Sequence, residues 1–439
     1  MHCGCNAACP RPFYCKEFCV KALVLPVALR GAVVPPPSKS QAHRLIVAAA
    51  LARGTSHIRG VDLSEDIQAT LNGVKSLGAS CVLTERDGLM DVALTGAAVD
   101  HHSPLPEVDC GESGSTLRFL IPVALVLRGG GLFTGHARLP QRPLEPYFSL
   151  FRGRDIRHAF EDSALVVQGT LEAGVFRLRG DISSQFFSGL LFALPLLPGE
   201  SRIELATPLE SQGYVDMTLD VLRRHGVDVA VRDGECWTVS GGRQYAASDN
   251  TVEKDFSQAA FFYAAQGIGN EVDVQGLNSE SCQGDRVIRR ISARLGDPGT
   301  VTINVSQCPD LVPAIAVQAA LRKGERTHIV NAGRLRLKES DRLATVASEL
   351  NKIGAKIQEK PDELVISGVE SFSGGDVESH QDHRIAMMLA VAATRAKAPL
   401  FISGAESVRK SYPGFWEQFK DLGGGVRLLP DNQDAERFV

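Results

Sequence analysis

The chain has 439 residues, of which 44% are hydrophobic and 22% are charged, and its formal net charge is −4. At roughly 100–200 residues per domain, this length predicts two or three domains, and the composition is typical of a globular protein rather than of a disordered chain or a coiled coil. The small acidic excess argues against nucleic acid as a partner, and no apolar run reaches the ~18 uncharged residues of a membrane span.

The first segment, residues 1–19, holds half of the ten cysteines. Cys and His lie close together there, as in a metal knuckle, but the spacing lacks the paired Cys-x₂-Cys of common zinc sites. The segment also lacks the apolar core of a secretory signal. We therefore interpret residues 1–19 as a disordered extension and expect no metal site there. The remaining cysteines are scattered along the chain, and we interpret them as core residues of a cytoplasmic protein.

An amphipathic helix pattern that ends in Gly and leads into two short strands recurs along the chain. The clearest copies are residues 69–96, 218–242 and 343–368, and weaker copies are 149–169, 286–306 and 415–430. Between them lie segments rich in Ala, Leu and Ile, which predict helices that are buried all round, each followed by a strand. The pattern predicts six βαβαββ units, three to a domain, with a division near residue 254.

The N-termini of these helices carry the chemical signal of the sequence. Four arginines follow a Ser or Asp that could cap the helix: Arg44 follows Ser40, Arg118 follows Ser113, Arg342 follows Asp341, and Arg384 follows Asp382. A cation in the first turn is unfavourable, because a helix N-terminus is already positive, unless an anion sits there. Further cations in similar stretches are Lys39, Arg138, Arg142, Lys338 and Lys410. The pattern favours a site for two anionic substrates.

Eight motifs now identify a family. PPSKSQAHR, GESGSTLR, HARLPQRP, SSQF, CPDLVP, LKESDR, QDHR and SVRKSYP occur in the order found in the enolpyruvyltransferases. Over about residues 20–439 the chain resembles this family, in particular its shikimate-pathway branch. The resemblance implies an α/β fold, a two-domain inside-out barrel of six βαβαββ repeats. Residues 20–37 and 254–439 would form one discontinuous domain and residues 38–253 the other, with the active site in the cleft between them.

The resemblance also implies an activity. The chain would transfer the enolpyruvyl group of phosphoenolpyruvate (PEP) to the 5-hydroxyl of shikimate 3-phosphate, in the pathway to chorismate. By the same resemblance it would be a cytoplasmic monomer that needs no metal or other cofactor. Glyphosate would inhibit it. Residues that resemble shikimate 3-phosphate contacts are Lys39, Ser40, Arg44, Ser183, Ser184, Gln185, Ser211, Asp310 and Lys338. Residues that resemble PEP contacts are Lys39, Gly114, Ser115, Arg138, Gln185, Arg342, Arg384 and Lys410.

Carboxylates among many cations suit the proton transfers of this reaction. By resemblance Asp310 is the base towards the 5-hydroxyl, Glu339 exchanges protons at the methyl carbon of the intermediate, and Lys39 is the acid. Asp310 could also cap the helix that follows it, and Glu339 could be a charge on a solvated face. The chain departs from the family pattern at Glu112 and Arg334, where members carry Asn.

Two other functions fit part of the pattern. The enolpyruvyltransferase that acts on UDP-N-acetylglucosamine carries Lys-Asn where this chain has Lys39 and Ser40, and it carries a loop cysteine that Gly135–Pro143 lacks. A non-catalytic binder of anionic metabolites would keep the arginines but could lose Asp310 and Glu339, which are both present. The sequence leaves open the degree of glyphosate sensitivity, the order of substrate binding and whether the cleft is open or closed.

Overall fold

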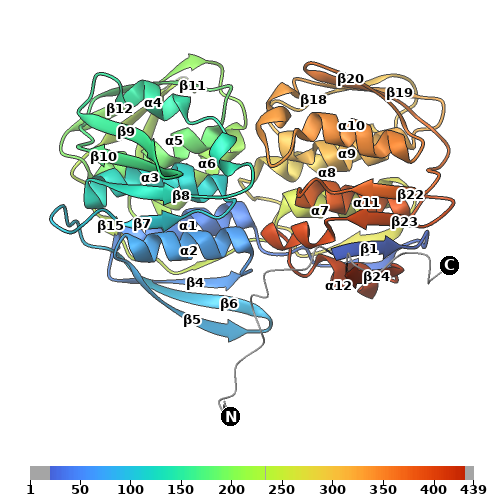
Figure 1. Cartoon of the computed structure of the whole chain (residues 1–439), viewed down its shortest axis with the longest axis horizontal. Helices are drawn as coiled ribbons and strands as arrows, with labels where there is room; N and C mark the ends of the chain where they lie inside the picture. The colour runs from blue at the N-terminus through green and yellow to red at the C-terminus, as the bar shows by residue number, and fades with distance from the viewer. Residues whose placement is uncertain (1–19, 233, 431–439) are drawn as a thin grey trace, which may run out of the picture.

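The structure is a computed structural model that describes residues 20–232 and 234–430, so the Cys-rich segment 1–19 lies outside the described residues. The fold is mixed α/β, and its two domains lie side by side (Figure 1). Within the described ranges, none of the helices combines the length and the apolar character of a membrane span.

The domain coloured blue to green in Figure 1 has its hydrophobic core between Ala42 and Val252. Its helices are α1 (Lys39–Leu51), α2 (Glu65–Ser76), α3 (Gly114–Arg128), α4 (Glu145–Phe151), α5 (Ser184–Ala193) and α6 (Gln212–Arg224), with 3₁₀ turns η1 (Leu139–Gln141) and η2 (Leu194–Leu196). Its four-stranded sheets have the orders β16 (Asn250–Thr251), β4 (Thr55–Val61), β6 (Leu89–Thr95), β5 (Ser80–Arg86); β7 (Glu107–Asp109), β8 (Gly130–Thr134), β10 (Ala164–Gly169), β9 (Ile156–Glu161); and β11 (Val175–Arg179), β12 (Glu200–Thr207), β14 (Cys236–Ser240), β13 (Val229–Arg232). A short pair joins β15 (Tyr245–Ala246) to β3 (Ala52–Arg53).

The second domain has a separate core, drawn from residues between Ala22 and Val33 and between Phe256 and Leu422. Its helices are α7 (Phe256–Gly267), α8 (Ile288–Arg294), α9 (Val312–Ala320), α10 (Arg342–Lys352), α11 (His383–Ala393) and α12 (Phe415–Asp421), with 3₁₀ turns η3 (Gly284–Val287), η4 (Pro309–Leu311), η5 (Gly333–Leu337) and η6 (Ala405–Lys410). Its four-stranded sheets have the orders β22 (Gly375–Glu378), β23 (Leu400–Ser403), β1 (Val20–Val24), β24 (Val426–Pro430); and β18 (Val301–Asn304), β19 (Arg326–Val330), β21 (Glu363–Ser367), β20 (Lys356–Lys360). A further pair joins β17 (Glu271–Val274) to β2 (Arg30–Val33).

All the four-stranded sheets share one pattern, in which the first two strands are parallel and the remaining neighbours are antiparallel. In three of these sheets the glycine that directly follows the third strand makes the same close approach. A Cβ placed on Gly96 would lie 2.0 Å from the Ala52 carbonyl oxygen. A Cβ on Gly241 would lie 2.0 Å from the Gly199 carbonyl oxygen, and one on Gly368 would lie 1.7 Å from the Arg322 carbonyl oxygen. The recurrence seen in the sequence therefore has a physical counterpart in the backbone packing.

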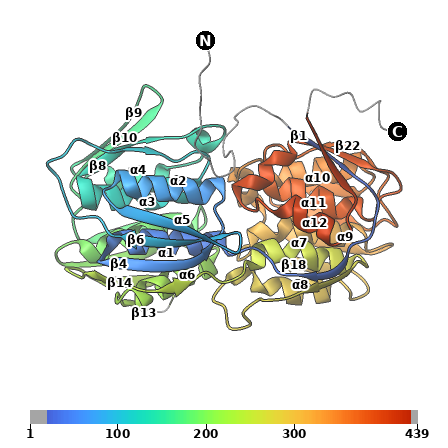
Figure 2. The same cartoon turned by 90° about the horizontal axis from the view of Figure 1, so that it is seen from below.

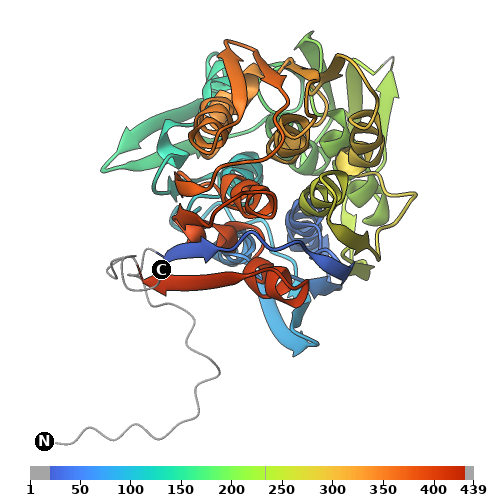
Figure 3. The same cartoon turned by 90° about the vertical axis from the view of Figure 1, so that its right-hand side faces the viewer.

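Two of the weaker copies depart from the predicted pair of strands. Residues 286–306 form only β18 after α8, because the short connection between them, residues 295–300, leaves no room for a second strand and its turn. Residues 415–430 form only β24, whose neighbour is the N-terminal strand β1. Figure 2 shows the blue N-terminal segment lying on the orange and red domain, and Figure 3 shows β1 beside the red β24. The two ends of the chain thus complete one sheet.

The helices predicted to be buried all round are buried. Every residue of α9 and α11 is buried, and the exposed residues of α1, α3, α5 and α7 are confined to a few positions. The chain passes between the domains twice, and the two crossings run side by side, since the Ser38 N–H donates to the Glu253 carbonyl at 2.7 Å. Both domains therefore meet along the ends of their central helices.

The close approach at Gly368 predicts a stability effect. Gly368→Ala should lower the free energy of unfolding by about 1–3 kcal/mol, because the new methyl group overlaps the Arg322 carbonyl and the strand ends must separate. The urea midpoint measures this loss. Gly414→Ala is the matched control, since a Cβ there meets no atom within 4 Å and the backbone φ is −84°. Equal midpoints for the two variants would contradict the prediction.

Candidate active site

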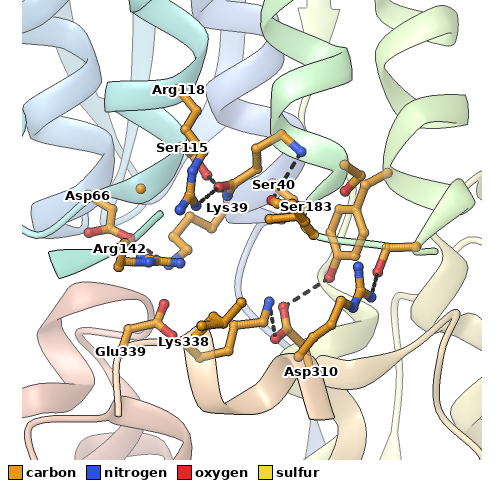
Figure 4. A pocket seen from close by; sticks show the side chains of 18 of the residues that line it. Lys39, Ser40, Asp66, Ser115, Arg118, Arg142, Ser183, Asp310, Lys338 and Glu339 are labelled. Atoms are coloured by element: carbon orange, nitrogen blue, oxygen red, sulfur yellow. Dashed lines mark hydrogen bonds and ion pairs between the residues drawn. The ribbon is translucent and has the colours of Figure 1, made fainter. Parts of the chain in front are cut away.

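A cleft lies where the two domains meet, and residues of both domains line it. In Figure 4, Lys39, Ser40, Ser115 and Ser183 lie on one side of it and Asp310, Lys338 and Glu339 lie on the other. The predicted contact residues that line this cavity are Lys39, Ser40, Arg44, Gly114, Ser115, Ser183, Ser184, Gln185, Ser211, Asp310, Lys338, Glu339 and Arg384. The lining also includes Arg118 and Arg142, which belong to the predicted set of cations, and side chains for which the sequence predicted no contact: Asp66, Tyr214, Arg334 and His383.

Three predicted residues lie outside this lining as the described residues define it. Arg342 is buried beneath the cavity, and Lys410 is held by other groups of the protein. Arg138 stands just before η1 and is half-buried, whereas Arg142, four residues further on, lines the cavity. Arg142 belonged to the predicted set of cations, but its motif did not single it out from Arg138.

The N-terminal ends of the buried helices converge on the cavity. α1 begins at Lys39, α3 at Gly114, α5 at Ser184 and α11 at His383, and Asp310 lies in the turn η4 directly before α9. Free N–H groups and the helix dipole make such ends favourable for anions. Cations and helix N-termini that share one cavity require negative charge from a ligand.

The predicted helix caps are confirmed except for one. Ser113, Asp341 and Asp382 accept hydrogen bonds from the first turns of α3, α10 and α11. Ser38 rather than Ser40 caps α1, because Ser40 is already the second residue of that helix. The prediction that all four arginines begin helices buried all round is wrong for α10, which is amphipathic.

Arg342 joins three carboxylates beneath the cavity. Its guanidinium lies 2.8 Å from Asp382, 2.6 Å from Glu339 and 2.8 Å from Asp310, and its side chain is 1% exposed. Burial alone would lower the pKa of Arg342, but the carboxylates raise it above its usual value. Asp382 is itself fully buried and accepts a further hydrogen bond from Ser340 at 3.0 Å. This pair therefore holds both Asp310 and Glu339 from below.

Asp310 faces three cations rather than the helix that follows it. Its carboxylate lies 3.1 Å from Lys338, 2.8 Å from Arg342 and 3.7 Å from Arg384. Asp310 makes no capping hydrogen bond to α9, so the capping interpretation is wrong. Burial alone would raise the pKa of this carboxyl, but the Lys338, Arg384 and Arg342 charges hold it well below its usual range. Asp310 is therefore ionised at neutral pH.

Glu339 is part of the same network. Its side chain is 19% exposed and pairs with Arg342, so it does not lie on a solvated face. Burial acts to raise the pKa of Glu339, but the charges of Arg342 and Arg142 hold it well below its usual range. His383 is 1% exposed, and neither of its ring nitrogens has a hydrogen-bond partner among the described residues. Burial, Lys39 and Arg384 lower the pKa of His383 well below its usual value, so its imidazole is neutral.

Two arginines of the opposite wall are held by neutral oxygens. Arg44 donates to Thr218 Oγ1 at 2.8 Å and to the Ser40 carbonyl at 2.7 Å, and burial lowers its pKa to about 10. Arg118 donates to Gln185 Oε1 at 2.6 Å, and burial together with Arg142 lowers its pKa to about 9. Both arginines keep their charge at neutral pH without a carboxylate partner, which leaves that charge available to a bound anion.

The two departures from the family pattern both form contacts between the domains. Glu112 Oε2 lies 2.8 Å from Lys410 Nζ. Arg334 donates to Ser211 Oγ at 2.5 Å and lies 2.7 Å from Glu210. Among the described residues, no group of three or more His, Cys, Asp or Glu side chains is arranged to hold a metal ion.

Comparisons with known proteins agree over nearly the whole chain. A family model described as EPSP synthase (3-phosphoshikimate 1-carboxyvinyltransferase) matches residues 25–419. A 3-phosphoshikimate 1-carboxyvinyltransferase of Clostridium perfringens (strain 13 / Type A) is 44% identical over 425 residues, which cover 93% of this chain and 99% of that protein. One of Clostridium kluyveri is 46% identical over 418 residues, or 91% and 97%. The structure of EPSP synthase from Acinetobacter baumannii matches with a TM-score of 0.75 at 27% identity and covers 93% of this chain and 100% of that chain.

The buried pair beneath the cavity predicts a large stability loss. Asp382→Asn should reduce the free energy of unfolding by about 3–5 kcal/mol, because Arg342 then keeps a buried charge with one counter-ion fewer. Thermal unfolding and urea midpoints measure the loss. Glu271→Gln removes the partner of Arg30 in a pair whose side chains are 73% and 70% exposed, and it should change stability by less than about 1 kcal/mol. Similar losses in both variants would show that the buried Arg342–Asp382 pair stabilises the fold no more than the exposed pair does.

Proposed function

The chain belongs to the EPSP synthase family, and on this premise we propose how its cleft binds and converts two anionic substrates. It is a transferase that moves the enolpyruvyl group of PEP to the 5-hydroxyl of shikimate 3-phosphate, releasing phosphate, in the shikimate pathway. The observation that carries the site assignment is the convergence of helix N-termini and cations around Asp310 and Glu339 in one interdomain cavity.

We also propose the finer architecture. Residues 20–37 with 254–439 form one domain and residues 38–253 form the other, each built of three βαβαββ units as an inside-out α/β barrel. The separate hydrophobic cores, the shared strand pattern and the pairing of β1 with β24 support this division. In this arrangement a small closing motion of the domains brings the two cavity walls together around the substrates.

Shikimate 3-phosphate lies along the wall formed by α1, α5 and α6. Ser183 and Ser184 at the start of α5, with Ser211 before α6, bind the phosphate, since hydroxyls and helix N–H groups are good phosphate donors. Ser40 and Arg44 bind the carboxylate, and Lys338 with Gln185 contacts the ring side. Arg334 reaches Ser211 from the other domain and adds a charge near the phosphate.

PEP lies between α3 and the Asp310 side of the cavity. Lys39, Ser115, Gln185 and Arg384 supply donors from both walls. Arg342, Lys410 and Arg138 complete the predicted set: Arg342 acts from beneath, and Lys410 and Arg138 act from the rim. Glyphosate, an anion of similar size, competes for the same donors. No step of this proposal needs a metal or an organic cofactor, and we propose that the enzyme is a cytoplasmic monomer.

Asp310 is the base for the 5-hydroxyl. In the empty cleft it is a weak base, because three cations stabilise its charge. Anionic groups of the substrates neutralise Lys338 and Arg384 when they bind, so the pKa of Asp310 rises towards the range in which it can accept a proton. The cleft thus becomes reactive only when it is filled.

Glu339 exchanges the proton at the methyl carbon of the intermediate, and Lys39 is the acid for the bridging oxygen. Lys39 Nζ lies 2.7 Å from Asp66 Oδ2, so Asp66 keeps the ammonium group directed along the cavity wall. The arginines stabilise phosphate and carboxylate charge as it is redistributed, in a cavity from which the closing domains exclude water.

The base assignment predicts a loss of turnover. Asp310→Ala should lower kcat by a factor of about 10²–10⁴ in a phosphate-release assay with PEP and shikimate 3-phosphate, because the hydroxyl proton has no acceptor. Binding of shikimate 3-phosphate, measured by calorimetry, should persist. Asp249→Asn is the control, since Asp249 pairs with Arg59 on the surface, where both side chains are 51% exposed.

The same assay separates this function from its nearest rival. Phosphate release by the wild-type protein should require shikimate 3-phosphate, and UDP-N-acetylglucosamine should not replace it. Turnover with the sugar nucleotide alone would contradict the proposed function, and a near-normal kcat in Asp310→Ala would contradict only the role of the base.

Gly114 predicts a change in anion affinity. A Cβ there would lie 2.6 Å from Arg142 Nη1 and 3.2 Å from Arg118 Nη1, so Gly114→Ala displaces the guanidinium groups that narrow the cavity. The KM for PEP and the inhibition constant of glyphosate should both rise, by about tenfold or more, which corresponds to at least 1.4 kcal/mol of binding free energy. Steady-state inhibition measures both constants, and unchanged values would show that PEP binds elsewhere.

A further inference from the structure

A tyrosine hydroxyl of one domain meets two carboxyl groups of the other at the edge of the cavity. Tyr214 Oη, on α6, lies 2.9 Å from Asp285 Oδ2 and 3.3 Å from Asp310 Oδ2. A phenol carries one proton, so Tyr214 can donate to only one of these oxygens. The other contact is a hydrogen bond only if its carboxyl group carries a proton and donates it to Tyr214. Burial, Asp285 and Asp310 raise the pKa of Tyr214 well above its usual value, so its hydroxyl stays protonated.

The surrounding charges decide which carboxyl group holds the extra proton. Asp310 has Lys338, Arg342 and Arg384 within ion-pair distance. Asp285 forms no ion pair with any of the described residues, its exposed fraction is 4%, and its Oδ1 has no hydrogen-bond partner among them. A buried anion with a bare oxygen is strongly unfavourable. Of the two carboxyl groups, Asp285 is therefore the one that takes up a proton more readily, and Asp310 is the one that stays ionised.

The elements packed around Asp285 supply little compensating charge. α6 presents Tyr214, η4 presents Asp310, α7 presents the Ser257 hydroxyl, which acts with Tyr214 to lower the pKa of Asp285, and α11 presents Arg384. On its own turn, Arg286 donates to the Ser279 carbonyl, and on α8 Arg289 donates to Tyr263. Burial and the Asp310 charge raise the pKa of Asp285 to about 6, although Arg384 acts in the opposite direction.

We propose that Asp285 is a positioning residue for the base, held as a neutral carboxylic acid in the substrate-filled cleft. Its Oδ2–H donates to Tyr214 Oη, and Tyr214 donates to Asp310 Oδ2. This chain of hydrogen bonds crosses from one domain to the other and fixes the Asp310 carboxylate against the closed wall. The inference rests on the proposed role of Asp310 as the base.

Substrate binding should strengthen this arrangement. Shikimate 3-phosphate brings two anionic groups into the cavity and engages cations that otherwise favour ionised Asp285. The proton affinity of Asp285 therefore rises on binding, and the complex takes up a proton from solvent. Because the bound state holds more protons, shikimate 3-phosphate should bind more tightly as the pH falls from about 8 towards 6.

Calorimetry in buffers of different ionisation enthalpy measures the proton uptake. The full chain should take up about 0.5 proton or more at pH 7 when it binds shikimate 3-phosphate, and Asp285→Asn should lose most of this uptake. Asp62→Asn is the matched control, because burial also raises the pKa of Asp62 to about 6 but its side chain lies outside the cavity lining. That variant should keep the wild-type uptake. Equal uptake in wild type and Asp285→Asn would overturn the proposal.

Two further readouts separate a positioning role from a structural one. The pH profile of kcat, which reports on the substrate complex, should lose its fall above about pH 7 in Asp285→Asn, whose amide can still donate to Tyr214 but cannot ionise. A profile unchanged from wild type would count against the proposal. If Asp285→Asn does not fold, infrared difference spectra of the wild-type protein should still show a carboxylic-acid carbonyl band appearing on addition of shikimate 3-phosphate at pH 7, and its absence would overturn the inference.

These outcomes are distinct from failure of the proposed function. If shikimate 3-phosphate does not bind at all, the substrate assignment is wrong. If it binds and is turned over without proton uptake, the function stands and only the role of Asp285 is wrong.

Discussion

The ion pair between Arg342 and Asp382 is the interaction on which the rest of the site depends. A guanidinium buried to 1% exposure can remain charged only with close counter-ions, and Asp382, fully buried, supplies one while it also caps α11. The same guanidinium then fixes Asp310 and Glu339 at its other edges. The two carboxylates that we propose as proton-transfer groups thus owe their positions to a buried pair beneath them, whereas the cations above them can pair with a bound ligand.

The cavity is electrostatically divided. On the side of Asp310 the cations are paired with carboxylates, whereas Arg44 and Arg118 on the other side are held by neutral oxygens and lose solvent without gaining a counter-charge. Helix N-termini add partial positive charge at the same place. An anionic substrate therefore completes a charge balance that folding leaves open, which explains how a chain with a net charge of −4 can recognise two anions.

Periodicity and motifs predicted the two-domain α/β fold, the buried helices and most of the cavity lining, because these depend on local patterns. The helix caps followed from residue type, with Ser38 replacing Ser40 by a shift of two positions. Tyr214 and Asp285 were not predicted, since their importance arises only where elements distant in sequence meet. The missing strand in 286–306 follows from the short connection between α8 and β18, which the repeat pattern did not reveal.

The pairing of β1 with β24 determines when this domain can fold during synthesis. Residues near 20 complete a sheet with residues near 430, so this domain cannot close until almost the whole chain has left the ribosome. The other domain, whose core lies between residues 42 and 252, can fold during synthesis. The early domain would then offer a formed wall, with α1, α3 and α5 in place, against which the later domain assembles its half of the cleft.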